Sequence, residues 1–118
     1  MDKEQNEPIL TVVFYRTDAG NEPVREWLKS LSREDKRIIG EDIKTAQFGW
    51  PLGMPLIRKL ERGLWEVRSN IKPGIARALF TVDGNTMILL HGFIKKSQKT
   101  PLTELNTACR RLADLQEE

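Results

Sequence analysis

The sequence is poor in the residues that cross-link small proteins or bind metal ions. It has one cysteine, Cys109, one histidine, His91, and one tyrosine among 118 residues. A single cysteine cannot form an intramolecular disulfide, and one histidine with one cysteine provides no cluster of zinc ligands. We therefore expect no disulfide framework, no bound metal and no cofactor.

Long hydrophobic runs are scarce as well. Met87–Leu90 (MILL) holds only four consecutive apolar residues, far fewer than a bilayer-spanning helix needs. The N-terminal stretch MDKEQNEP is polar and acidic, unlike a signal peptide. We therefore expect a cytoplasmic protein without membrane contact, and 118 residues fit one domain that covers residues 1–118.

The formal net charge of +2 hides an uneven distribution along the chain. Residues 1–50 carry 8 Lys and Arg against 10 Asp and Glu, whereas residues 51–118 carry 11 against 7. Residues 58–99 hold nine basic residues against three acidic ones. The basic residues are Arg58, Lys59, Arg62, Arg68, Lys72, Arg77, Lys95, Lys96 and Lys99. Such an excess indicates a polyanionic partner, although a charged run on any solvated face has the same composition.

The first half of the chain predicts a strand followed by two helices. Residues 9–16 are β-branched and aromatic, as in a strand. A helix over residues 22–31 follows, with Asn21 as its cap and Pro23 in its first turn. A second helix over residues 33–48 opens at Ser32 with a capping-box-like arrangement. The segment 50–55, with two prolines and a glycine, is expected to be a connector.

The second half predicts three strands and a final helix. Residues 63–69, 75–82 and 86–93 alternate as strands do, and Asp83-Gly84-Asn85 is typical of a hairpin turn. We expect an antiparallel meander over residues 63–93. Thr100 and Pro101 supply a cap and a first-turn proline for a C-terminal helix. The predicted fold class is α+β: an antiparallel sheet packed by an N-terminal helical hairpin and a C-terminal helix.

Several residues of the basic segment have side chains suited to RNA chemistry. Cleavage of RNA without metal needs orientation of the ribose 2′-OH, stabilisation of charge on the phosphate, and proton transfer. Arg68 and Arg77 lie in neighbouring predicted strands and can reach one sheet face. His91 and Phe93 share a face of the next strand, while Leu90 and Gly92 are expected on the other. The lysines of residues 95–99 follow the end of that strand, and an aromatic ring on this face can stack on a base.

Each of these residues also has a structural interpretation. Arg68 and Arg77 can pair with Glu66 or with other acids, and His91 can be a hydrogen-bonded structural residue. The lysine loop can be plain solvated surface. The tryptophans at positions 27, 50 and 65 are expected to pack in the core, and Cys109 to behave as a small buried apolar residue.

The segment 60–101 carries a family resemblance. Its LWEVRS, ARALF and HGFIKKSQKTP stretches resemble the phage-derived Gp49-like branch of the RelE/HigB toxin superfamily. The resemblance implies a RelE-like domain and a toxin of a type II toxin–antitoxin system that cleaves mRNA on the translating ribosome. It also implies a helix-turn-helix (HigA-like) antitoxin whose complex with the toxin binds promoter DNA.

The resemblance also implies site residues. The strand arginines are Arg68 and Arg77, and the lysine pair after the HGF strand is Lys95 and Lys96. Some members of the superfamily use a C-terminal tyrosine or histidine that has no counterpart here, which leaves His91 and the lysines as substitutes or leaves catalysis mainly to positioning on the ribosome. The catalytic prediction is Arg68, Arg77, His91, Lys95 and Lys96, and the RNA-binding prediction is Arg58, Lys59, Phe93 and Lys99.

Two other functions remain open on the sequence. A ParE-like toxin shares the general fold but inhibits DNA gyrase, and a non-enzymatic binding module needs no catalytic set. Retention of Arg68, Arg77 and the lysine pair favours RNA cleavage.

Overall fold

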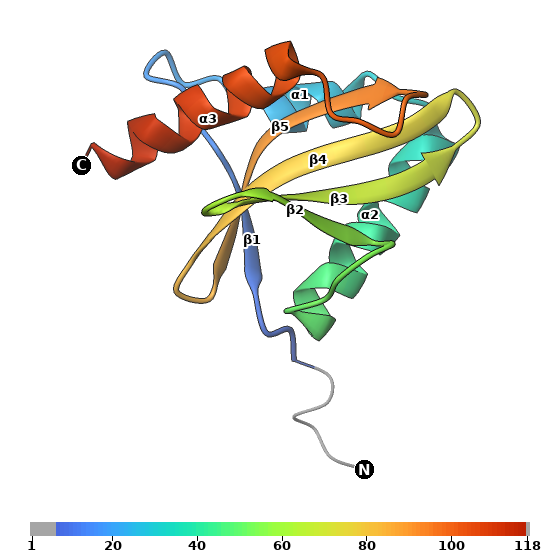
Figure 1. Ribbon diagram of the computed structural model, residues 1–118, viewed down its shortest axis with the longest axis horizontal. Coiled ribbons are helices and arrows are strands. Elements are labelled where there is room, and N and C mark those ends of the chain that lie inside the picture. The colour runs from blue at the N-terminus through green and yellow to red at the C-terminus, as the bar shows by residue number, and fades with distance from the viewer. Residues whose placement is uncertain (1–6, 118) are drawn as a thin grey trace.

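The computed structural model describes residues 7–117 (Figure 1). The first six residues of the polar N-terminal stretch and Glu118 lie outside the described residues. The strands are β1 (Thr11–Phe14), β2 (Ile57–Glu61), β3 (Leu64–Ile71), β4 (Gly74–Asp83) and β5 (Thr86–Lys95). The helices are α1 (Pro23–Lys29), α2 (Arg33–Gly49) and α3 (Leu102–Gln116). The expected helices and the hairpin turn before β5 are confirmed, and the first strand is shorter than expected.

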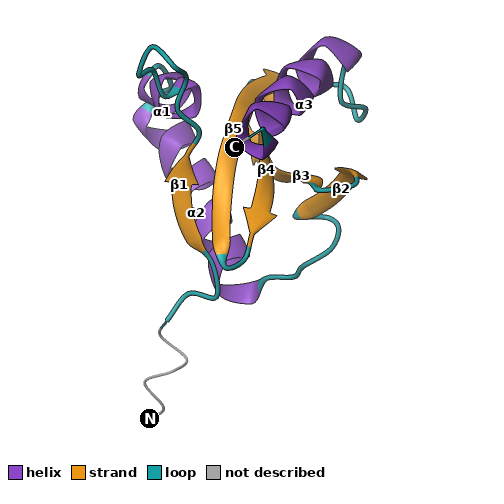
Figure 2. Ribbon diagram, turned by 90° about the vertical axis from the view of Figure 1, so that its left-hand side faces the viewer, coloured by secondary structure: helices purple, strands orange, loops and turns teal. Residues whose placement is uncertain are grey.

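The five strands form one mixed sheet in the order β1-β5-β4-β3-β2. Strands β2 to β5 are consecutive antiparallel neighbours, which confirms the meander over residues 63–93. The expectation of a purely antiparallel sheet is wrong, because β1 pairs in parallel with β5 (Figure 2). Hydrophobic alternation fixes which face a strand buries but not which strand it pairs with, and α1 and α2 carry the chain across the sheet between β1 and β2.

Strand β2 was not expected from the sequence. Its residues IRKLE bury only Ile57 fully and leave Lys59 and Glu61 exposed. Edge strands commonly carry such charges, which prevent pairing with other chains and hide the period-two pattern. The register shift between Lys59 and Glu61 weakens the pattern further.

Helices cover both faces of the sheet. Figure 1 shows α2 behind the sheet and α3 in front of it. The first face packs on α1 and α2 through a core that includes Leu10, Ile39, Ile43, Val67, Phe80 and Leu89. The second face packs on α3 through Leu64, Leu79, Leu90, Phe93 and Ala108. We call these the α2 face and the α3 face.

The aromatic residues confirm the expected core packing. The Trp50 and Trp65 rings meet edge to face with centroids 5.1 Å apart, and both contact Phe80. Trp27 lies directly over Gly92, where a Cβ atom would come within 2.2 Å of the indole ring. Gly92 therefore lies on the α2 face, as its alternation with Phe93 predicted.

A β-bulge changes the alternation at Leu90. Leu79 pairs with His91, whereas the next residue, Phe80, pairs with Leu89, so Leu90 has no cross-strand partner. Leu90 therefore joins Phe93 in the core of the α3 face. Its expected position on the opposite face is wrong, because strict alternation ends at the bulge.

The helix caps agree only in part with the sequence. The Ser32 hydroxyl accepts the Asp35 N–H at 3.1 Å, which confirms the start of α2. The caps expected for the other two helices are wrong. Glu22 precedes α1 and Pro101 precedes α3, neither with a side-chain cap. Thr100 instead uses its hydroxyl in the site described below.

Among residues 7–117, no helix combines the length and apolarity needed to cross a membrane.

Candidate active site

Three arginines from three adjacent strands meet on the α3 face. Arg68 of β3 lies opposite Arg77 of β4, and Arg58 of β2 lies opposite Glu66 of β3. Arg77 is fully buried, and the side chain of Arg68 is only 9% exposed. We call Arg58, Arg68 and Arg77 the arginine cluster.

One buried acid partly neutralises the arginine cluster. Glu66 is 0% exposed, and its Oε2 atom lies 3.0 Å from Arg68 Nη1. Its other oxygen, Oε1, accepts the Thr100 hydroxyl at 2.8 Å. The structural interpretation of Arg68, pairing with Glu66, is therefore present, but within one strand rather than across two. Three guanidiniums against one carboxylate leave the cluster with an excess of positive charge.

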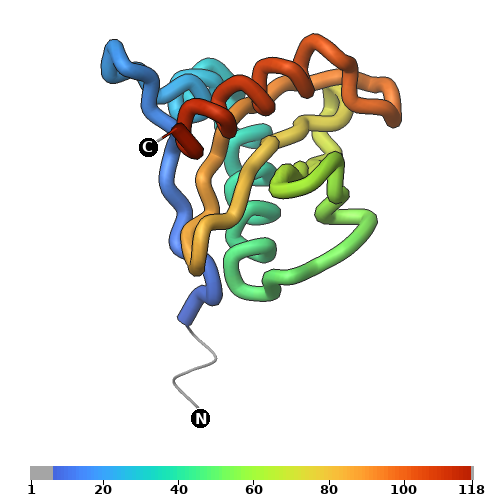
Figure 3. Tube along the Cα trace, turned by 60° about the vertical axis from the view of Figure 1, so that its left-hand side comes forward, coloured from blue at the N-terminus to red at the C-terminus, as the bar shows by residue number. Residues whose placement is uncertain are grey.

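The segment Ser97–Thr100, which we call the β5–α3 loop, covers the arginine cluster. Figure 3 shows the chain reversing here between β5 (orange) and α3 (red). The Ser97 carbonyl accepts from Arg77 Nη2. The Gln98 carbonyl accepts from Arg58 Nη1 at 3.2 Å and from Arg68 Nη1 at 3.3 Å, and its side-chain oxygen accepts from Arg68 Nη2 at 2.9 Å. The loop thus supplies neutral oxygen acceptors to all three guanidiniums.

Arg77 is incompletely paired beneath this loop. Its Nε and Nη1 atoms are buried and have no hydrogen-bond partner within residues 7–117. Its Cζ lies 5.8 Å from the centroid of the Phe93 ring. Burial lowers the pKa of Arg77, and Glu66 opposes this change only in part. A charged donor left unpaired in a protein interior is costly and uncommon, and such groups mark sites of strain or function.

His91 is held by α3 and not by the arginine cluster. Its Nε2 atom lies 2.6 Å from Glu104 Oε1, and its Nδ1 atom lies 3.3 Å from Arg111 Nη1. Arg111 also donates to the Leu90 carbonyl at 2.8 Å, beside the bulge. Both ring nitrogens of His91 are thus engaged, an arrangement that suits the structural interpretation of this residue.

The comparison with known families matches most of the chain. A model of the family described as phage-derived protein Gp49-like matches residues 26–113, which include every residue of the arginine cluster and of the β5–α3 loop. The chain belongs to the Gp49-like family. This is a RelE/HigB-like toxin family, so the resemblance noted in the sequence is confirmed. No curated protein matches the chain.

The structure of this Gp49-like protein gathers only some of the predicted site residues. It brings Arg58, Arg68 and Arg77 together, with Phe93 beside Arg77. The Phe93 ring is 7% exposed and also stacks on His91, with centroids 5.8 Å apart. Its predicted role in base stacking stays a prediction and requires one of these neighbours to move.

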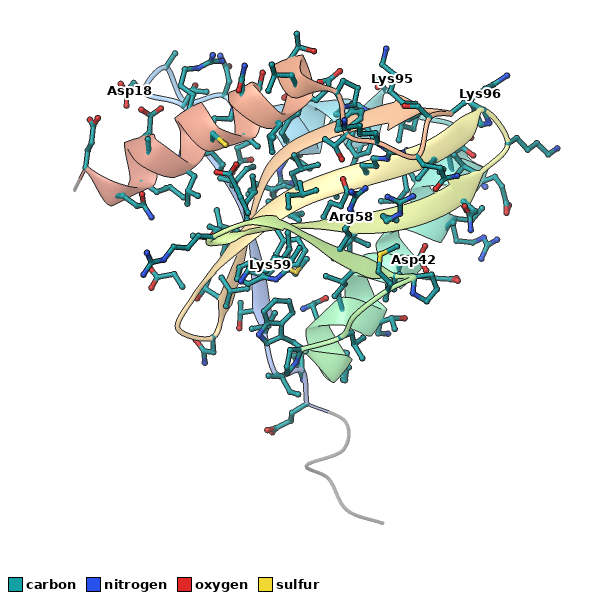
Figure 4. The ribbon with its side chains drawn as sticks, in the orientation of Figure 1. Asp18, Asp42, Arg58, Lys59, Lys95 and Lys96 are labelled. Carbon is teal, nitrogen blue, oxygen red and sulfur yellow. The ribbon has the colours of Figure 1, made fainter. Side chains whose placement is uncertain are left out.

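The predicted lysines lie apart from the arginine cluster. Figure 4 shows Lys95 and Lys96 pointing outward at the end of β5, away from Arg58. Lys99 is exposed on the β5–α3 loop. Lys59 is exposed on β2, with its Nζ 5.9 Å from the Trp65 ring, so it belongs to the α2 face. All four lysines are exposed, whereas Arg77 is fully buried.

Other polar groups of the chain have structural partners. The Tyr15 hydroxyl donates to Asp114 at 2.8 Å, and this hydrogen bond raises the pKa of Tyr15. The Cys109 thiol donates to Glu61 at 3.3 Å, and burial raises its pKa. Within residues 7–117, no three His, Cys, Asp or Glu side chains gather closely enough to hold a metal ion.

Sequence reasoning missed the acceptors in the site. Gln98 contacts the arginine cluster and Thr100 contacts Glu66, whereas the sequence predicts only a polar loop and a helix cap at these positions. Two of the acceptors are main-chain carbonyls, which any residue provides, so no residue type signals them.

Proposed function

We propose that this RelE-like Gp49-like protein is the toxin of a type II toxin–antitoxin pair, and that it cleaves mRNA on the translating ribosome. The family supports a toxin. The observation that best supports nuclease activity is the arginine cluster, in which three guanidiniums lie near one buried carboxylate. In this proposal the protein acts in the cytoplasm as one domain, without metal or cofactor.

The arginine cluster is suited to the charge that RNA cleavage creates. In-line attack of a ribose 2′-OH on the adjacent phosphate places additional negative charge on the phosphate oxygens. Preorganised cations stabilise such charge best where water is excluded. Arg77 has two nitrogen atoms without acceptors, Nε and Nη1, and its Nη2 atom also becomes available to a phosphate if the Ser97 carbonyl moves away. Arg68 is held in place by Glu66 and provides the second guanidinium.

We propose that proton transfer contributes less than positioning. His91 is bound by Glu104 and Arg111, so it is poorly placed to act as a general base. Orientation of the 2′-OH by the ribosome can supply a large part of the rate enhancement. The exposed Lys95, Lys96 and Lys99 then bind phosphates around the cleavage point, where they raise affinity without acting on the bond.

The partner in this proposal is a small helix-turn-helix (HigA-like) antitoxin, whose complex with the toxin binds promoter DNA. The family supports an antitoxin partner. A surface that attracts RNA phosphates also attracts acidic side chains, so an acidic segment laid over the basic residues would silence the toxin.

The nuclease activity is tested by inducible expression in a bacterial host, with primer extension on an abundant transcript. We expect cuts within coding regions that appear during translation, vanish in Arg77→Met, and persist in the matched control Arg33→Met, whose arginine is exposed on α2. Growth arrest with intact transcripts would instead favour the gyrase-inhibiting alternative. Normal growth of cells that express the parent protein would contradict the toxin assignment.

The antitoxin is tested by co-expression of the adjacent small reading frame. We expect it to restore growth and to co-purify with this chain. A toxic protein that no neighbouring frame binds or neutralises would contradict the toxin–antitoxin assignment, while the nuclease activity would remain.

A further inference from the structure

The β5–α3 loop presents oxygen atoms where a phosphate would present its own. Three loop oxygens, the Ser97 carbonyl and both oxygens of Gln98, accept N–H groups from Arg58, Arg68 and Arg77. These are the guanidiniums that the proposed nuclease needs for RNA. With Arg77 fully buried under the loop, RNA cannot reach it while the loop stays in place.

We propose that the β5–α3 loop is an autoinhibitory lid over a phosphodiester site. The lid closes the site by placing neutral carbonyl oxygens against the guanidiniums, and a phosphate replaces these oxygens when the lid opens. This inference rests on the proposed function and adds the regulation of its site.

Hydrogen bonds within residues 7–117 hold the lid in place. Besides the guanidiniums, its attachments are the Thr100 hydroxyl on Glu66 at 2.8 Å and an internal contact from the Ser97 hydroxyl to the Lys99 carbonyl at 3.1 Å. Residues 97–99 are exposed, and none belongs to either hydrophobic core. Opening therefore breaks a few hydrogen bonds and removes none of residues 97–99 from a hydrophobic core, a property of segments that open readily.

A phosphate satisfies the arginine cluster better than the lid does. The lid leaves Arg77 Nε and Nη1 without acceptors. The lid's acceptors are neutral oxygens, whereas a phosphate adds attraction between opposite charges to each hydrogen bond with a guanidinium. An anion that enters the site gains these stronger bonds and also pairs the two orphaned donors, so it favours the open state.

The closed lid must lower the apparent affinity for anions. When only a fraction of the protein is open, the apparent dissociation constant rises in inverse proportion to that fraction. Gln98→Ala removes the 2.9 Å bond between the side-chain oxygen and Arg68 but leaves the main-chain carbonyl. Hydrogen bonds to charged groups contribute enough that we expect the open fraction to rise about ten-fold.

The test measures the binding of inorganic pyrophosphate to the full chain by calorimetry. We expect Gln98→Ala to bind about ten times more tightly than the parent, as the opening equilibrium requires. Thr100→Val, which breaks the contact with Glu66, should shift binding in the same direction. The matched control Gln116→Ala removes an exposed glutamine of α3 and should bind like the parent. Arg77→Met should not bind.

Trypsin provides a second measurement, because Lys96 directly precedes the lid and Lys99 lies within it. If pyrophosphate binds over the closed lid, it should protect the loop from trypsin. If it opens the lid, as we propose, cleavage after these lysines should become faster. Gln98→Ala should be cleaved faster than the parent even without ligand.

The lid is refuted if Gln98→Ala and Thr100→Val bind pyrophosphate no more tightly than the parent, or if no variant binds it. It is also refuted if pyrophosphate protects the loop from trypsin. These measurements use neither ribosomes nor mRNA, so their failure is distinct from a failure to find mRNA cuts, which would overturn the nuclease proposal alone.

Discussion

Replacing the best-placed arginine of the site should make the protein more stable. Arg77 is fully buried, and its Nε and Nη1 atoms have no partner among residues 7–117. Each unpaired buried donor costs about 1–3 kcal/mol. Arg77→Met keeps a similar side-chain volume and removes both donors. It also removes the bond to the Ser97 carbonyl and the contact with the Phe93 ring, which together contribute about 1–2.5 kcal/mol.

The balance favours the variant. At mid-range values the two unpaired donors outweigh the lost contacts by about 2 kcal/mol, so we expect Arg77→Met to raise the free energy of unfolding by about that amount, in the range found when buried ionic groups are replaced by apolar ones. For a chain of this size the melting temperature should rise by roughly 3–10 °C. Growth inhibition and mRNA cleavage should be lost in the same variant. A residue that lowers stability and is needed for activity has a functional reason to be kept.

Arg68→Met is the matched comparison, because its stability should change in the opposite direction. Arg68 is the ion-pair partner of Glu66, which is 0% exposed. Among residues 7–117, its removal leaves the buried carboxylate with the Thr100 hydroxyl as its remaining side-chain hydrogen-bond partner, and we expect a loss of about 2–4 kcal/mol. Urea denaturation of both variants measures the difference. A loss of stability in Arg77→Met as large as that in Arg68→Met would refute the reasoning, since it would mean that the Arg77 donors are satisfied in solution.

Three further predictions concern the packing of the helices. Glu104→Ala should lower stability by about 1–2 kcal/mol in urea denaturation, because His91 loses its 2.6 Å partner; unchanged stability would show that this pair does not hold α3. Gly92→Ala should cost about 1–3 kcal/mol, since its Cβ would enter the Trp27 ring; a stable variant at the parent melting temperature would contradict this packing. Tyr15→Phe should cost about 0.5–1.5 kcal/mol near pH 7. Because the folded protein raises the pKa of Tyr15 above its ordinary value of about 10, the bond stabilises fully below that pH and is lost as pH rises through the folded value. The difference between parent and variant should therefore shrink in alkaline unfolding curves, and a constant difference would disprove the coupling.

The fold was predictable where one strand follows another by a short turn. Period-two alternation and the turn around Gly84, whose φ is +61°, gave the hairpin of β4 and β5. The parallel pairing of β1 with β5 joins residues about 75 positions apart, and no local pattern encodes it. The bulge at Leu90 was equally hidden, because an extra residue in one strand is visible only against its partner strand.

The site was predictable in its cations and not in its acceptors. Basic residues in adjacent strands predicted that Arg68 and Arg77 would share a face, and their direct opposition follows from the β3–β4 register. The hydrogen bonds of the Ser97 carbonyl with Arg77 and of His91 with Glu104 depend on how α3 packs on the sheet. No local sequence pattern predicts that packing. For that reason alternation placed His91 near Phe93 correctly but could not show that both of its nitrogens are engaged.

Two partly or fully buried arginines of this chain illustrate how the hydrogen-bond partners separate a structural role from a functional one. Burial lowers the pKa of Arg111, as it does that of Arg77. Arg111 donates to the Leu90 carbonyl and contacts His91, so its charge fastens α3 to the bulge of β5. Arg77 is more deeply buried than Arg111 and has fewer of its donors paired. Its unpaired Nε and Nη1 atoms add nothing to the stability of the fold. Because natural proteins keep such groups chiefly where function requires them, the unpaired Nε and Nη1 atoms of Arg77 support the phosphate site that we propose.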